Sequence, residues 1–366
     1  MGYSQSSVLR VGVVGIGFGQ QAHIPAFRRR RDCEVTVLCA SSEARARTVA
    51  DRLGVPHAHG DWRKLVADPG IDAISVATPP ALQPAIVTAA LEAGKPVFCE
   101  KPLALSGDRA LAMLLAARQS GLANMVDFEF VTIGAWLQAK RLMEQGVVGQ
   151  LRHVSVTWHV ETYANRMGIK SWKTAPAAMG GGTLASAVSH TFHYLEWLLV
   201  PIRQLTAKLF IPPGAGAMLG ETAVVMCLEL EGGASGSVSV CSNAFLGSGH
   251  RVEIYGDQGS LFLDNSTSDY VAGFTLARGT RQTNKLEPVA AEPADFEAGD
   301  GRILAVGRLV DRFVEWVRTG VAASPSFEDG YRVQQLMECA ILADSTGGWV
   351  AVPLPERPKE SREPGA

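Results

Sequence analysis

Short apolar runs and helical stretches alternate along the first third of the chain, and this alternation limits the possible folds more than any other feature. Four runs rich in valine and other apolar residues are typical of buried strands: 9–14, 34–39, 72–77 and 96–99. Helical patterns follow them at 20–30, 43–53, 84–93 and 108–120. Strands that are joined through helices pair in parallel. The pattern therefore predicts an α/β domain with a doubly wound parallel sheet over residues 1–123.

The remaining chain has a different pattern. Helices are expected at 133–145, 180–199, 302–319 and 327–345. Strand-like runs are found at 151–161, 203–211, 221–231, 234–243 and 250–264. Successive strands with tight turns favour antiparallel pairing. We therefore expect a second, α+β domain over 124–352 with a large, open and mostly antiparallel sheet, closed by the last two helices. The proline- and charge-rich tail, 353–366, is expected to be disordered.

Charge and cysteine content exclude several classes of protein. The formal net charge is −2, which gives no general attraction to nucleic acid or to an anionic membrane. No uncharged apolar stretch reaches the roughly 20 residues needed to span a bilayer. Residues 1–7 lack the features of a secretory signal, and none of the six cysteines forms a C-x-x-C pair. We expect a cytoplasmic protein without nucleic-acid or membrane partners.

A glycine-rich turn joins the first strand to the first helix. Gly15 and Gly17 match the first two positions of G-x-G-x-x-G, whereas Gln20 takes the sixth position and Gly19 lies one place early. Such a turn brings backbone N–H groups to a pyrophosphate. With Phe18, these residues are predicted to bind a dinucleotide; the alternative is a tight turn without a ligand.

The end of the second strand bears on which nicotinamide cofactor would bind. A carboxylate at this point is typical of NAD sites, whereas this chain has Ser41, Ser42 and Arg45. Two hydroxyls and a guanidinium suit a 2′-phosphate, so NADP(H) is favoured over NAD(H). Alternatively, Ser41 or Ser42 only caps the helix and Arg45 is solvated.

Two longer stretches resemble one enzyme family. They are VATPPALQPAIVTAALEAGKPVFCEKPLA at 76–104 and GGGTLASAVSHTFHYLEWLL at 180–199. With the spacing between them, the chain resembles the Gfo/Idh/MocA oxidoreductases over nearly its whole length. Glu100-Lys101-Pro102 is the most specific match. The resemblance implies a Rossmann domain, a homo-oligomer (dimer or tetramer) formed through the C-terminal sheet, and substrates such as sugars, nucleotide sugars and inositols.

The resemblance also implies particular site residues. Beside the glycine turn, it assigns cofactor contacts to Thr78, Pro79, Glu100 and Lys101. The family's catalytic lysine and histidine fall on Lys101 and His190. Three positions depart from the family: two common aspartates fall on Ser186 and His193, and a common histidine falls on Gln83, which we place with the cofactor contacts.

The chemistry of these residues is consistent with proton transfer during hydride exchange. A partly desolvated lysine at Lys101 could take the proton of a substrate hydroxyl, or it could only pair with phosphate, ribose or Glu100. His190 could exchange a proton at neutral pH, or it could be a packed core histidine. Ser186 lies four residues earlier on the same helix face and could bind the hydroxyl or a water. Without a carboxylate at 186, the pKa of His190 should be lower than in relatives.

Substrate contacts are harder to assign. Trp172 and Lys173 could form a platform for a sugar, or they could belong to a lid or an interface. His193 could contact the substrate, or it could be a helix residue that faces the partner sheet. His190 and His193 are spaced as metal ligands can be, but no third ligand is close in sequence, so no metal is expected.

These residues favour an NADP-dependent dehydrogenase or reductase that acts on a carbohydrate-like secondary alcohol or ketone. Two alternatives remain. One is an atypical family member that acts on an imine or an unsaturated intermediate of secondary metabolism. The other is a catalytically degenerate sensor or scaffold that binds nucleotide.

Overall fold

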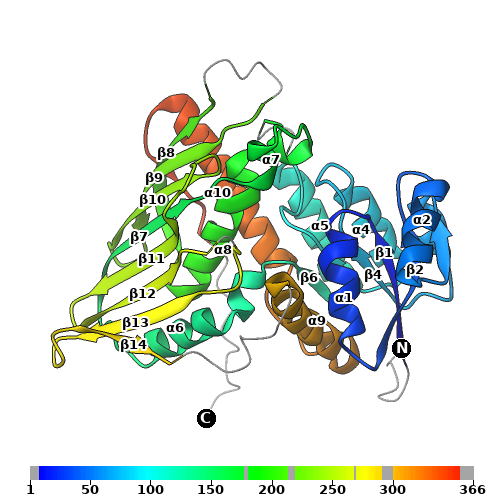
Figure 1. Ribbon diagram of the computed structural model, residues 1–366, viewed down its shortest axis with the longest axis horizontal. Coiled ribbons are helices and arrows are strands. Elements are labelled where there is room, and N and C mark those ends of the chain that lie inside the picture. The colour runs from blue at the N-terminus through cyan, green and yellow to red at the C-terminus, as the bar shows by residue number, and fades with distance from the viewer. Residues whose placement is uncertain (1–7, 177–179, 213–218, 268, 291–299, 355–366) are drawn as a thin grey trace, which may run out of the picture.

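The protein is built from two sheets with helices around and between them (Figure 1). The computed structural model describes residues 8–176, 180–212, 219–267, 269–290 and 300–354. The first sheet has six strands in the order β3-β2-β1-β4-β5-β6, and every pair in it is parallel. Its strands are β1 (Leu9–Val14), β2 (Cys33–Cys39), β3 (His57–His59), β4 (Ala73–Val76), β5 (Val97–Cys99) and β6 (Asn124–Val126). The predicted doubly wound domain is confirmed.

The helices of this first domain lie close to the predicted ranges. They are η1 (Gly19–His23), α1 (Ile24–Arg28), α2 (Glu43–Leu53), α3 (Trp62–Ala67), α4 (Gln83–Glu92) and α5 (Gly107–Ser120). Gly54, with φ 62°, and Gly121, with φ 66°, end α2 and α5 in the left-handed conformation that glycine allows. Strand β3 and helix α3 were not predicted. β6 extends the first sheet three residues beyond the boundary expected at 123.

The second sheet has nine strands in the order β14-β13-β12-β11-β7-β10-β9-β8-β15. They are β7 (Leu151–His159), β8 (Ile202–Phe210), β9 (Ala223–Leu230), β10 (Ser235–Cys241), β11 (Gly249–Gly256), β12 (Gly259–Asn265), β13 (Thr275–Thr280), β14 (Leu286–Val289) and β15 (Val350–Ala351). All pairs are antiparallel except β7 with β10. The single strand expected at 250–264 is a hairpin of β11 and β12. The predicted open, mostly antiparallel sheet is confirmed.

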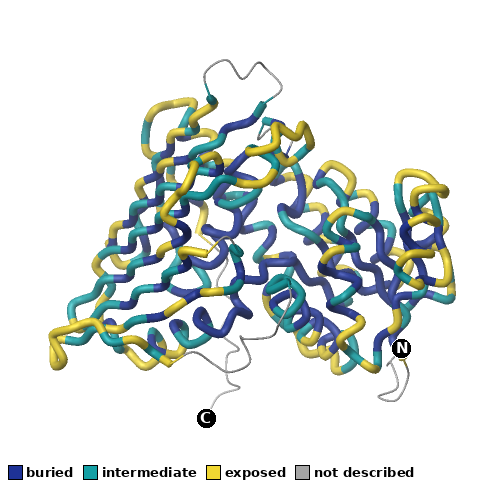
Figure 2. Tube along the Cα trace, in the orientation of Figure 1, coloured by how far each residue is buried: buried dark blue, intermediate teal, exposed yellow. Residues whose placement is uncertain are grey.

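Alternating burial shows which face of this sheet is covered. Along β7, Val154, Val156 and Trp158 are buried, whereas Ser155 and Thr157 on the opposite face are partly exposed (Figure 2). Three helices pack against the sheet: α6 (Gly134–Glu144), η5 (Leu184–Val188) and α10 (Phe327–Thr346). The other helices of the domain are η2 (Glu129–Thr132), α7 (Tyr163–Arg166), η3 (Trp172–Thr174) and α8 (Ser189–Leu198). The tail predicted to be disordered lies outside the described residues from 355 onward.

Helix α9 (Gly301–Thr319) packs on η1 and α1 of the first domain and also on η2 of the second (Figure 1). Val310, Phe313 and Val314 of α9 join a buried cluster with β1, α1 and α2. The residue range of this helix was right, but the expectation that it closes the C-terminal domain describes only part of its packing. The reason is that apolar periodicity marks a buried helix face without identifying the surface that covers it.

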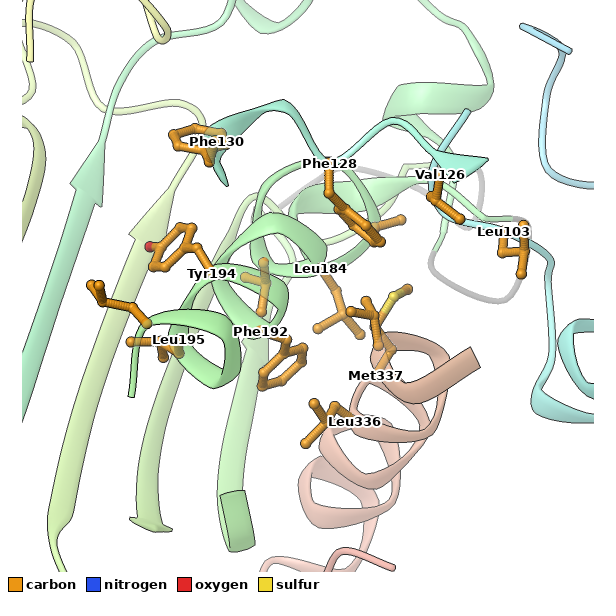
Figure 3. Close-up of a cluster of buried hydrophobic side chains, with 14 of the residues drawn as sticks. Leu103, Val126, Phe128, Phe130, Leu184, Phe192, Tyr194, Leu195, Leu336 and Met337 are labelled. Atoms are coloured by element: carbon orange, nitrogen blue, oxygen red, sulfur yellow. The ribbon is translucent and has the colours of Figure 1, made fainter. Parts of the chain in front are cut away.

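The opposite face of the first sheet packs into a core that continues across both domains. One buried cluster joins the two parts of the chain (Figure 3). It contains Leu103, Val126 and Phe128 from the first domain and the segment after that domain, and Leu184 and Met337 from the second domain. α10 contributes Met337, and it packs on both α5 and β8. Within the described residues, no helix is both long and apolar enough to cross a membrane.

Candidate active site

The glycine turn between β1 and η1 has the geometry of a dinucleotide-binding loop. A Cβ atom on Gly15, whose φ is 114°, would lie 2.1 Å from the carbonyl oxygen of Ala77. A Cβ on Gly17 would meet nothing within 4 Å, so its backbone borders open space. A Cβ on Gly19 would lie 3.2 Å from side-chain atoms of both Ala77 and Val13. Gly19, rather than residue 20, therefore allows the close packing of helix on strand that the third glycine of the motif provides.

The neighbours of this turn are held by other side chains. The side-chain oxygen of Gln20 accepts a hydrogen bond from Arg52 of α2. The ring of Phe18 lies edge-on to His23 at 5.6 Å and 5.5 Å from the guanidinium of Arg302. Direct cofactor contacts of Phe18 and Gln20 stay predictions.

The end of β2 carries the predicted phosphate-binding residues on the surface. Ser42 caps α2 and accepts a hydrogen bond from the backbone of Arg45 at 3.4 Å. The guanidinium of Arg45 donates to the Ser41 hydroxyl at 2.9 Å. Capping is thus present, and Ser41 and Arg45 are close enough to bind one anion together.

Thr78 and Pro79 follow β4 at the carboxyl edge of the same sheet. The hydroxyl oxygen of Thr78 is buried and has no hydrogen-bond partner among the described residues. A buried polar atom of this kind normally has a partner. With the open space at Gly17, this orphaned hydroxyl fits a bound dinucleotide, which Gly15, Gly17, Thr78 and the Ser41–Arg45 pair would hold.

Gln83 fixes the backbone that carries Lys101. Its buried amide nitrogen donates to the carbonyl oxygens of Glu100 at 3.0 Å, Pro102 at 2.7 Å and Leu103 at 3.0 Å. The Lys101–Pro102 peptide bond is cis. The structure therefore gives Gln83 a role in shaping this turn, and its contact with a cofactor stays a prediction.

Lys101 connects the two domains. Its Nζ donates to the main-chain carbonyl oxygen of Ser186 at 2.6 Å. Burial lowers the pKa of Lys101, the carboxylates of Glu129 and Glu100 oppose the change, and the resulting pKa is about 8. The Ser186 hydroxyl instead donates to the carbonyl of Gly182 at 2.7 Å. Ser186 therefore meets Lys101 through its backbone.

His190 lies in α8 directly after the π-helical turn η5, a feature that is frequent at functional sites. Its Nδ1 is 3.7 Å from a carboxylate oxygen of Glu129 and has no hydrogen-bond partner in the described part of the chain. Burial and the charge of Lys101 hold the pKa of His190 well below its usual range. The imidazole is therefore neutral at pH 7, and it lies near enough to Lys101 for their charges to interact.

His193 faces other groups than Lys101. Its ring stacks on Phe128 with centroids 4.2 Å apart. Burial lowers its pKa to about 4, and the charges that act on it belong to Asp329 of α10 and Arg312 of α9. The structure does not bring His193 together with Lys101, so its predicted substrate contact gains no support.

Trp172 and Lys173 lie in the short helix η3 beside the site. The Lys173 ammonium is 5.7 Å from the centre of the Trp172 ring. Lys173 is exposed, and its charge contributes to the lowered pKa values of Lys101 and His190. Its position is consistent with the predicted substrate contact.

Sequence reasoning missed His23 and Asp127, which form a buried group of titratable residues with the predicted site residue Glu100. The imidazole of His23 contacts Ser75 at 2.7 Å and the carboxylates of Glu100 and Asp127 at 3.2 Å each. Burial disfavours charge on His23, but the two carboxylates outweigh it and raise its pKa to about 9. Asp127 follows β6, a three-residue strand that sequence patterns did not reveal. The acidic residues within the apolar run ANMVDFEF were the one available signal.

The same group could be considered as a metal site. Ligand atoms of His23, Glu100 and Asp127 lie within 4.8 Å of one another. Both ring nitrogens of His23 already have hydrogen-bond partners. An imidazolium between two carboxylates accounts for the cluster, and we assign no metal to it.

Comparisons with known proteins agree with this geometry. The family model described as "Oxidoreductase family, NAD-binding Rossmann fold" matches residues 9–128, and the "GFO/IDH/MocA C-terminal domain" matches 136–262. An uncharacterized oxidoreductase of Synechocystis sp. is 32% identical over 96% of this chain and 98% of its own length. A levoglucosan dehydrogenase of Pseudarthrobacter phenanthrenivorans is 27% identical over 94% and 98%, respectively. Inositol 2-dehydrogenase 1 of Saccharopolyspora erythraea is 28% identical over 96% and 98%.

A solved structure extends the similarity to three dimensions. Levoglucosan dehydrogenase in complex with NADH has a TM-score of 0.85 at 26% identity, covering 95% of this chain and 100% of that chain. A second structure of that enzyme contains both NADH and levoglucosan, with the same TM-score of 0.85.

Proposed function

Because the chain belongs to the GFO/IDH/MocA family of oxidoreductases, we propose that it acts on the secondary alcohol or ketone carbon of a sugar, nucleotide sugar or cyclitol. One observation carries the proposal: Lys101 is held between the two domains by the Ser186 carbonyl, near enough to His190 for its charge to act on that ring. A sugar-like substrate is supported by relatives that are named as levoglucosan and inositol dehydrogenases.

The residues of the chain manage the proton of the substrate hydroxyl. A nicotinamide, when bound, supplies the hydride acceptor or donor. In oxidation, the neutral amine of Lys101 takes the hydroxyl proton, and a pKa of about 8 leaves part of the lysine neutral at physiological pH. The Ser186 carbonyl then accepts a hydrogen bond from the new ammonium. Neutral His190 orients the hydroxyl, and in reduction Lys101 returns the proton.

Replacement of Lys101 tests this assignment. In Lys101→Ala we expect kcat to fall by about a thousandfold, because general acid–base groups contribute roughly 10²–10⁴ in rate. Cofactor affinity, followed by quenching of protein fluorescence, should change less than about threefold. Lys64→Ala removes an exposed lysine of α3 and serves as the matched control. Unchanged turnover in Lys101→Ala would exclude Lys101 as the acid–base group. Cofactor binding by the wild-type protein without turnover of any sugar or keto-sugar would favour the sensor role.

We further propose that NADP(H) is preferred over NAD(H). Ser41 and Arg45 are hydrogen-bonded to each other and both are exposed, so they could bind a 2′-phosphate with little rearrangement. Arg45→Ala should weaken NADPH binding about tenfold, since a charge-assisted contact contributes roughly 1.5–3 kcal/mol. NADH binding should be unaffected. Arg47→Ala, two residues along the same helix, is the control. Tighter binding of NADH than of NADPH by the wild-type protein would reject this preference.

We also propose that the protein is a homo-oligomer, a dimer or a tetramer, that associates through the outer face of the nine-stranded sheet. Val225 and Cys227 of β9 are exposed on this face. Exposed apolar side chains on a sheet face are typical of a contact surface.

A further inference from the structure

We propose that Glu129 is the carboxylate partner of His190 in this chain and acts as a positioning residue for the proton transfer at Lys101. This inference rests on the proposed function and deepens it. It answers the question left by Ser186, which stands where the resemblance places an aspartate. The side chain of Ser186 is directed to the Gly182 carbonyl, so it does not serve as that partner.

The first support for this proposal is the position of Glu129 beside His190. Glu129 opens η2, directly after Phe128, and is only 2% exposed. Its carboxylate oxygen lies 3.7 Å from Nδ1 of His190, and among the described residues no other carboxylate lies within ion-pair distance of that ring. Nδ1 has no other partner there. A buried nitrogen without a partner beside a buried carboxylate indicates a contact that is almost formed.

The backbone around Glu129 is firmly held by α9. The Thr132 hydroxyl donates to the carbonyls of Glu129 at 2.7 Å and Ala305 at 2.9 Å. Arg308 and Arg312 of α9 donate to the carbonyls of Thr132 at 2.6 Å and Val131 at 3.4 Å. A separation of 3.7 Å is too long for a hydrogen bond. Such bonds are often long before the substrate binds and shorten in the complex.

A hydrogen bond from Nδ1 to Glu129 would define the tautomer of His190. With the proton on Nδ1, the lone pair on Nε2 is free to accept a hydrogen bond from the substrate hydroxyl. The carboxylate thereby orients the ring and fixes which nitrogen is available. An aspartate at position 186 would be expected to orient the ring and fix its tautomer in the same way.

The charges around Glu129 come from several elements. Lys101 and Glu100 follow β5, and Asp127 follows β6. His190 lies on α8, and Tyr270 lies in the loop between β12 and β13. Burial and Asp127 raise the pKa of Glu129 to about 8, against the opposing charge of Lys101. Because the pKa of Lys101 is also about 8, the two groups titrate over the same range, and ionised Glu129 stabilises the ammonium that forms at Nζ.

The kinetics of Glu129 variants test whether the negative charge of Glu129 acts on Lys101. Alcohol oxidation needs neutral Lys101, so kcat/KM rises as pH passes the pKa of that lysine. The negative charge of Glu129 favours the ammonium and raises this pKa. Glu129→Gln should therefore move the acid limb of the pH profile down by about one unit and lower kcat about 10- to 100-fold. KM and cofactor affinity should change little. Glu129→Asp, and the double variant Glu129→Gln with Ser186→Asp, should each recover part of the rate.

A control and a spectroscopic readout separate this role from a structural one. Glu144→Gln removes an exposed carboxylate of α6 and should leave both kcat and the pH profile unchanged. At a pH above 8, where Glu129 is ionised, histidine-selective ¹⁵N NMR of the full chain, which has eight histidines, should show the Nδ1–H tautomer at His190. In Glu129→Leu this tautomer preference should be lost. If Glu129→Leu does not fold, the isosteric Glu129→Gln variant decides the matter by its pH profile.

Two outcomes would overturn the proposal. One is an unchanged kcat and acid limb in Glu129→Gln, and the other is an unchanged tautomer of His190 in Glu129→Leu. A wild-type protein that turns over no alcohol would reject the proposed function instead. In that case the NMR comparison would still decide whether Glu129 is the partner of His190.

Discussion

At the scale of single residues, burial brings the pKa values of Lys101 and Glu129 in the candidate site close to each other. The same desolvation lowers the pKa of Lys101 and raises the pKa of Glu129, because the charged form is the acid of one and the base of the other. Both reach about 8. Burial and the charge of Lys101 hold the pKa of His190 well below its usual range, so the ring stays neutral. Small changes in charge at this site should therefore have large effects on its pH dependence.

Two glycines of the cofactor turn should respond differently to alanine. In Gly15→Ala the new Cβ would lie 2.1 Å from the Ala77 carbonyl at a positive φ, which should cost roughly 2 kcal/mol or more of folding free energy. In Gly17→Ala nothing obstructs the Cβ, so stability measured by urea unfolding should be kept. Cofactor affinity should still fall about tenfold or more, because the methyl group occupies the space that the pyrophosphate approaches. Normal cofactor binding in Gly17→Ala would show that this space is not used.

The residues that a short motif marks could be predicted, and those that only the fold brings together could not. Lys101 and His190 are found from local sequence, and the structure places them near one another. Glu129 is separated from His190 in the chain by a strand and several helices. His193 shares a helix with His190, yet stacking on Phe128 directs it elsewhere. Sequence spacing gives the face of a helix but not the groups that cover that face.

At the scale of elements, position in the fold differs from position in the chain. β6 was missed because three residues carry too little periodicity to be distinguished from a turn. The π-helical turns η1 and η5 look like ordinary helix in sequence, since one added residue barely alters the apolar pattern. α9 was predicted at the right residues, but its packing on η1 and α1 of the first domain was not foreseen. Local sequence patterns thus predict whether an element is a helix or a strand better than they predict which elements it packs against.

Truncation of a single side chain in α9 should destabilise the cofactor domain. Phe313 is fully buried, with ring centroids 6.4 Å from Phe27 and 5.9 Å from Phe98. Phe313→Ala should lower the free energy of unfolding by about 3–5 kcal/mol, and cofactor affinity should fall with it. Val321→Ala, at a position that is 70% exposed just after α9, should stay within about 0.5 kcal/mol of wild type. Equal stability of Phe313→Ala and wild type would contradict this packing.

At the scale of the whole molecule, the two domains share one hydrophobic core. The cluster that contains Leu103 and Val126 of the first sheet and its connections also contains Leu184 and Met337 of the second domain (Figure 3). A common core limits independent movement of the domains and keeps Lys101 in register with Ser186. The outer face of the nine-stranded sheet has no such cover within the described residues (Figure 2).

Association through that face can be tested with one charge. Val225 is 44% exposed in the middle of β9, so Val225→Arg should place a hydrated cation in the contact. Sedimentation velocity should then show a smaller species than the wild-type protein gives. Leu115→Arg, at a residue of α5 that is 53% exposed, should leave the sedimentation coefficient unchanged. An oligomer that persists in Val225→Arg would place the interface elsewhere.

The location of α9 has a consequence for how this protein is made. During synthesis, the apolar cluster that contains Phe27 of α1 and Phe98 of β5 lacks the side chains of α9 until residue 319 has left the ribosome. At roughly 5–20 residues per second, elongation from residue 126 to that point takes about 10 to 40 seconds. Throughout that interval an apolar surface is available to chaperones or to neighbouring nascent chains. The first domain is thus translated first but completed late, so codon choice upstream of α9 should influence the yield of folded enzyme.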